Sequence, residues 1–88
     1  MNYQTLYTNV QKGMNKEKVI SIMKEPPKLV FQEKNRKVLW WDDEKINKTK
    51  EMEISETIVY SVDTFFLPVT FEFSFDLDGN IIGKHKYD

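Results

Sequence analysis

Hydrophobic positions change their spacing once along the chain. Up to residue 24 they recur every three or four positions, which is typical of amphipathic helices, and after Pro27 they alternate with polar positions, which is typical of strands. The sequence therefore predicts a single domain over residues 1–88 of the α+β class. In it, two N-terminal helices pack on one face of an antiparallel sheet of four or five strands.

Two short helices are predicted before the strands begin. The first covers residues 3–11 and is ended by Gly13. The second covers Lys16–Lys24, because Asn15 can cap its first turn by accepting hydrogen bonds from unpaired backbone N–H groups. Pro26–Pro27 cannot continue a helix, so the second helix must end before them.

The strand predictions rest on alternation and on turn residues. Val69–Leu77 is the clearest strand, because its odd positions are all apolar and its even positions are all polar. Asp78–Asn80 has the composition of a hairpin turn. The other predicted segments are strands at Leu29–Gln32, Val38–Glu44, Thr57–Val62 and Ile81–Tyr87, a hairpin turn at Glu33–Lys37, and a long charged loop at Lys45–Glu56, with Asp63–Pro68 left ambiguous.

Charge is uneven although the chain's net charge is only −1. Residues 1–37 carry eight Lys or Arg and three acids, whereas residues 38–88 carry five Lys and eleven acids. The basic residues of the first half are scattered and lack a glycine-rich or aromatic RNA-binding signature, so the sequence does not favour a nucleic-acid partner. No apolar run approaches the ~18 residues of a membrane span, and the first ten residues do not read as a signal peptide.

The inventory of reactive groups is small. The chain has no cysteine, and its one histidine, His85, lacks the clustered partners of a metal site or of a catalytic triad. Asp76–Asn80 resembles the start of a calcium loop, but its glycine falls at the wrong position, so a β-turn is the better interpretation. We therefore expect a non-enzymatic protein with no cofactor and no metal.

The stretch Gly13–Pro27, "GMNKEKVISIMKEPP", resembles the helix signature of the SmpA/OmlA family. These are small outer-membrane lipoproteins that include the BamE subunit of the β-barrel assembly machinery. Phe71–Gly83 is similar to the family's closing hairpin. The resemblance implies the α-α-β-β-β-β fold and a protein-binding role. Two departures stand out: Lys24 occupies the position where the family generally has Gly, and there is no lipid-bearing cysteine in the chain.

Adjacent aromatic residues suggest where a partner could bind. Neighbouring residues of a strand face opposite ways, so two adjacent tryptophans, at positions 40 and 41, cannot both enter one core layer. Exposed tryptophan is a common anchor for a protein partner. The alternative is that residues 45–66 fold over this face. The predicted partner surface is the open sheet face with its adjoining acidic residues, and it comprises Trp41, Tyr60, Phe66, Asp42 and Asp43.

These patterns favour a protein-interaction module of the bacterial cell envelope, a monomer or weak homodimer, with any lipid anchor lying outside this chain. One alternative is a secreted or periplasmic inhibitor that presents Asn35–Arg36 or the 45–56 loop to an enzyme cleft. Another is a small cytoplasmic or phage-encoded regulator, for which Met1 would be the native start.

Overall fold

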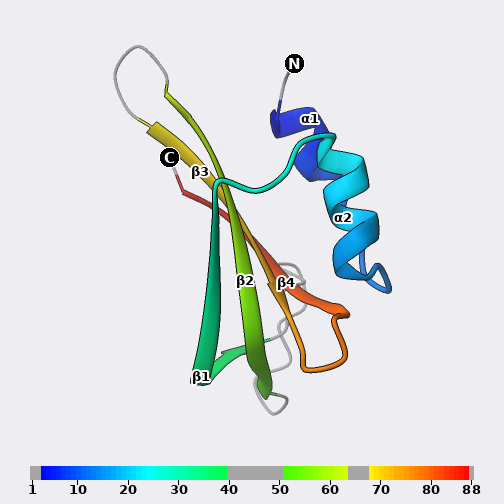
Figure 1. Cartoon of the computed structure of the whole chain (residues 1–88), viewed down its shortest axis with the longest axis vertical. Coiled ribbons are helices and arrows are strands. Elements are labelled where there is room, and N and C mark those ends of the chain that lie inside the picture. The colour runs from blue at the N-terminus through cyan, green and yellow to red at the C-terminus, as the bar shows by residue number, and fades with distance from the viewer. Residues whose placement is uncertain (1–2, 40–50, 64–67, 88) are drawn as a thin grey trace.

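The computed structural model describes residues 3–39, 51–63 and 68–87. Those residues form two helices and a four-stranded antiparallel sheet with the strand order β1-β2-β3-β4, which confirms the predicted α+β class. Both helices lie on the same side of the sheet (Figure 1). The elements are α1 (Tyr3–Asn9), α2 (Lys16–Met23), β1 (Leu29–Leu39), β2 (Glu51–Asp63), β3 (Pro68–Phe75) and β4 (Ile81–Tyr87).

Helix α2 begins and ends where its local sequence predicts. The Asn15 side chain accepts a hydrogen bond from the backbone N–H of Lys18 at 2.8 Å, which satisfies one orphan donor of the first turn. Lys24 ends the helix in the left-handed conformation, with φ 66°, and its backbone N–H binds the carbonyl oxygen of Ile20. A lysine therefore holds a backbone conformation that glycine adopts more easily.

The β3–β4 hairpin is bonded to the start of α2. The backbone N–H of Lys16 donates to the carbonyl oxygen of Gly79 at 3.0 Å, and the N–H of Ile81 donates to that of Met14 at 2.8 Å. Figure 1 shows the turn of this hairpin beside the loop that precedes α2. These two bonds set the position of the helix layer along the sheet.

The core lies between the helices and one face of the sheet. Both helices contribute apolar side chains to it, and β2 and β3 supply most of the aromatic surface through edge-to-face and tilted ring contacts. The buried members are Val10, Val19, Met23, Ile58, Tyr60, Phe71, Phe73, Phe75 and Ile81.

The prediction of a hairpin turn at Glu33–Lys37 was wrong, because these residues lie within β1. The chain does not turn there but stays paired with β2 on both sides: Gln32 lies opposite Glu56, and Arg36 lies opposite Ile54. Residues 33–35 of β1 therefore lie against the single residue 55 of β2, which is a bulge. A polar, turn-like stretch was accommodated as a bulge because the neighbouring strand continues past it.

The prediction of a loop at Lys45–Glu56 was wrong for its last six residues, which belong to β2. Residues 51–56 belong to a strand that runs from Glu51 to Asp63, and the rest of that loop lies outside the described residues. The charged composition of residues 51–56 did not indicate a strand. These residues form one because they pair with β1, which is distant in the sequence. Val38–Glu44 was predicted as a separate strand; its first two residues form the end of β1 and residues 40–44 lie outside the described residues.

The predicted strand Val69–Leu77 is confirmed up to Phe75, where β3 ends. Leu77 was expected on the apolar face, but it lies in the turn and is 89% exposed. The Asp76 side chain explains this early end, because its Oδ1 accepts hydrogen bonds from the backbone N–H groups of Asp78 and Asn80 and so starts the turn.

Candidate interaction surface

Tyr60 lies on the opposite face from the one predicted. It is 1% exposed, belongs to the core beneath the helices, and packs edge-to-face on Tyr3 and Phe73. The prediction was wrong because Ile58, Val59 and Tyr60 are apolar in succession, so alternation along β2 does not identify the core face. A partner cannot reach Tyr60 in this fold. The other predicted members, Trp41, Asp42, Asp43 and Phe66, lie outside the described residues.

Exposed apolar side chains occur instead at the start of β1. Leu29 is 54% exposed, and Val30 and Phe31 are each 47% exposed. We call these three residues the β1 triplet. Strand β1 is at the edge of the sheet, and in the described part of the chain it pairs with β2 alone. Its other side therefore presents backbone N–H and C=O groups beside three adjacent apolar side chains.

The strand register places the β1 triplet on both faces of the sheet. Val30 lies opposite Ile58, which faces the helices, so Val30 is on the helix side. Leu29 lies opposite Val59, and both are on the other face. This second face is not bare at its centre, because Thr57, Val59, Ser74 and Ile82 are buried there, with the Thr57 and Ser74 hydroxyls 3.3 Å apart.

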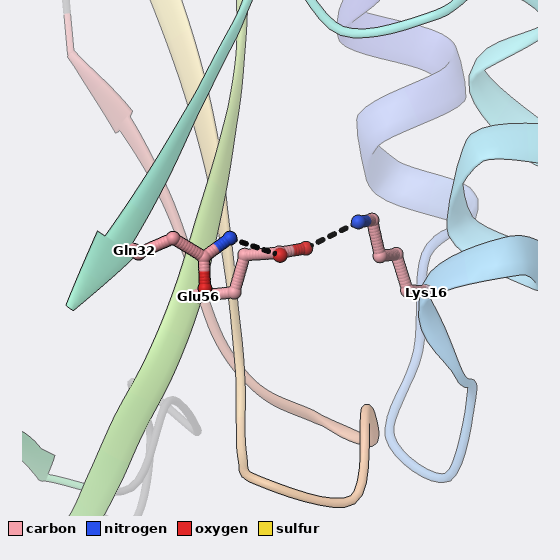
Figure 2. Close-up of polar contacts among 3 residues, drawn as sticks. All are labelled: Lys16, Gln32 and Glu56. Atoms are coloured by element: carbon pink, nitrogen blue, oxygen red, sulfur yellow. Dashed lines mark hydrogen bonds and ion pairs between the residues drawn. The ribbon is translucent and has the colours of Figure 1, made fainter.

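A polar cluster on the helix side follows the β1 triplet directly along the strand. The Gln32 side-chain amide donates to the Glu56 carboxylate at 2.6 Å, and the Lys16 amine lies 2.5 Å from the other carboxylate oxygen (Figure 2). The hydrogen bond from Lys16 lowers the pKa of Glu56, assisted by Gln32 and opposed by partial burial. The cluster links β1, β2 and the first turn of α2, so it fixes the edge strand against the helix layer.

The segment between α2 and the β1 triplet is held in place by hydrogen bonds with core residues. The Tyr60 hydroxyl donates to the backbone carbonyl oxygen of Glu25 at 2.7 Å, and the Tyr3 hydroxyl donates to the Glu25 side chain. The backbone N–H of Lys28 then donates to Val59 at 2.8 Å. Burial raises the pKa of Tyr60 to about 12, and the hydrogen bond with Glu25 raises that of Tyr3. Residues on both sides of Pro26–Pro27 are thus held before β1 begins.

The two edges of the sheet differ in character. Strand β4 forms the opposite edge. Its first three residues are buried, and they are followed by Lys84, His85, Lys86 and Tyr87. The ring centres of His85 and Tyr87 are 4.2 Å apart. Charged residues on an edge strand discourage the addition of another strand. The start of β1 is uncharged and exposed, whereas the uncharged start of β4 is buried, so the β1 triplet is the edge segment better suited to a partner.

No metal-ligand group was found in the described ranges: nowhere in them do three or more His, Asp or Glu side chains gather. No helix within those ranges is long and apolar enough to cross a membrane. Comparison of the chain with protein-family models, with curated proteins and with solved structures found no match in any of the three.

Sequence reasoning missed the β1 triplet as a surface. Residues 29–32 were correctly predicted as a strand, but their apolar side chains were assigned no exposed role. The available signal was the run of three adjacent apolar residues, since a strand with one covered face needs only alternate ones. That signal does not distinguish an exposed edge from a strand buried on both faces.

Proposed function

We propose that this protein is a non-enzymatic protein-interaction module of the bacterial cell envelope, similar to the SmpA/OmlA group, and that the β1 triplet forms part of its partner surface. The observation that carries the proposal is the exposure of Leu29, Val30 and Phe31 on an edge strand. Three adjacent exposed apolar residues, on a strand that pairs on one side only within the described ranges, can template pairing with another chain, and a bound partner would cover them.

The backbone at Lys24 bears on the resemblance to the SmpA/OmlA group. The SmpA/OmlA pattern generally has Gly at that position, and Lys24 here has the left-handed conformation that glycine favours. The conformation agrees with the pattern at this position and bears on the fold, whereas many helices end in this way and the compartment is left to experiment.

The inhibitor alternative loses one of its two binding segments. Asn35–Arg36 was to be the tip of a hairpin, but these residues lie within β1 and are paired or bulged against β2. Inhibitors of the type considered present the tip of a loop, whereas these two residues belong to a strand. The interaction-module hypothesis needs no such loop.

Photo-crosslinking in cells of the source organism tests the partner surface. Phe31 and Leu77 are each replaced by benzoylphenylalanine; both positions are exposed, but only Phe31 lies on β1. We expect a specific crosslinked protein from position 31 and none from position 77. Equal crosslinking from both positions, or none from position 31, would count against the proposed surface.

The compartment is tested separately by the intact mass and cell fraction of the native protein. A membrane-bound form with a diacylated cysteine ahead of Asn2 would support the envelope role. A product beginning at Met1 in the cytoplasmic fraction would remove that role and leave the interaction surface to be judged by crosslinking alone.

A further inference from the structure

The charged residues around the β1 triplet bear on the chemistry of a partner. Lys28 precedes the triplet, Lys34 follows it, and both are exposed. In the described part of the chain neither lysine side chain is ion-paired, whereas the nearby acids are engaged: Glu25 accepts a hydrogen bond from Tyr3, and Glu33 has a contact of its own. The positive charges of Lys28 and Lys34 can therefore attract acidic groups of a partner.

We propose that β1 binds an extended apolar segment of another protein as an additional strand, and that acidic residues flank this segment at both ends. The proposal rests on the proposed function and names the class of partner for the same surface. Backbone hydrogen bonds to the edge of β1 that no other described strand occupies would supply affinity, and side chains would supply selectivity. Acidic flanks would lie beside Lys28 and Lys34, where opposite charges attract.

The same lysines argue against a second copy of this chain as the occupant. In an antiparallel pairing of two β1 strands centred on Phe31, Lys28 of one copy lies directly opposite Lys34 of the other. Centring the pair on Val30 makes the two lysines diagonal neighbours. Like charges in these positions destabilise strand pairing, so self-association is opposed at both ends of the triplet.

The apolar requirement follows from the register. Leu29 and Phe31 face away from the helices and Val30 faces them, so a strand added to β1 would meet apolar surface on both sides of the sheet. A segment with apolar residues at its centre covers this surface, and a wholly acidic segment does not.

The test uses the full chain and synthetic peptides. The first peptide has alternating valine and threonine with aspartates at both ends. The second has lysines in place of the aspartates. The third is the first with every backbone amide of its valine–threonine segment methylated, which removes the N–H donors of both edges of the peptide but keeps the side chains. Binding is measured by calorimetry, and amide hydrogen exchange is followed along β1. We expect the acidic-flanked peptide to bind at least tenfold more tightly than either other peptide and to protect amides of residues 29–33.

Charge reversal provides the matched control. Lys28→Glu combined with Lys34→Glu should reverse the preference, so that the lysine-flanked peptide binds better, while Lys18→Glu on exposed helix α2 should leave the preference unchanged. Circular dichroism checks that each variant is folded.

Each other outcome overturns a distinct statement. Equal binding of acidic- and lysine-flanked peptides would overturn the charge selection but not the proposed function. Equal binding of the methylated peptide would overturn strand addition. A dimer in sedimentation equilibrium that Phe31→Lys dissociates would make a second copy the occupant. If no peptide binds but crosslinking at position 31 succeeds, this inference fails and the proposed function survives; if both fail, neither survives.

Discussion

The side-chain amine of Lys84, in the last strand, donates a hydrogen bond to the backbone carbonyl oxygen of Val10 at 3.0 Å. The same amine donates to the carbonyl oxygen of Tyr7 at 3.1 Å and lies 4.6 Å from the centre of the Tyr7 ring. Helix α1 has no basic residue in its last turn, so β4 supplies the positive charge that its C-terminal carbonyl groups favour.

Replacing Lys84 with methionine should therefore destabilise the whole domain. Methionine keeps the apolar stem but leaves the two carbonyl oxygens without this donor, at a cost of about 2 kcal/mol in the free energy of unfolding. Chemical denaturation measures the loss. Lys18→Met, on the exposed side of α2, is the control and should change stability by less than about 0.5 kcal/mol. Similar losses in both variants would show that Lys84 does not cap α1.

Lys24→Gly should stabilise the protein. The left-handed conformation at φ 66° costs a residue with a Cβ atom about 1 kcal/mol, and glycine removes this cost. The matched control is Lys18→Gly within α2, which should lower stability by about 1 kcal/mol because glycine is a poor helix former. Thermal unfolding of both variants should thus shift in opposite directions; a loss of stability at both positions would contradict the assigned conformation.

The pKa of Glu56 gives stability a specific dependence on pH. Because Lys16 and Gln32 lower this pKa in the folded state, the stabilisation is present above the ordinary value of 4.5 and is lost as the pH falls through the lowered folded value. Glu56→Gln should remove this part of the acid sensitivity. The measurement is the free energy of unfolding from pH 7 down to about pH 3.

Lys16→Met tests the cause of that effect. If Lys16 is the main reason for the lowered pKa, the two single variants and the double variant should share one flatter acid profile. A wild-type slope retained in Lys16→Met would assign the acid sensitivity to other carboxyl groups.

Tyr60→Phe should cost about 1 kcal/mol, because the carbonyl oxygen of Glu25 loses a hydrogen-bond donor in a partly buried site. The wild type should also lose stability in alkali as the pH rises from 10 towards 12: folding raises the pKa of this hydroxyl, so its stabilisation is present below the unfolded value and is lost above it. Denaturation across this range should show a smaller alkaline loss in Tyr60→Phe. An unchanged alkaline profile would mean that burial does not raise the pKa of this hydroxyl.

The sequence by itself determined those parts of the protein whose causes are local. Asn15 and Pro26–Pro27 bound α2 because capping and the missing proline N–H act within a few residues. Asp78–Asn80 forms the predicted turn, and Phe71, Phe73 and Phe75 face the core because alternation fixes one face of a strand.

Tertiary structure decided the rest. Whether Glu33–Lys37 turns or bulges depends on β2, a partner about twenty residues away, and whether Tyr60 faces the helices depends on which side of the sheet they cover. The exposure of the β1 triplet was decided in the same way, because a strand becomes an edge only when the order of the whole sheet is set. Local residues carry no information about these distant neighbours, so composition and period could not reveal the surface that we propose binds the partner.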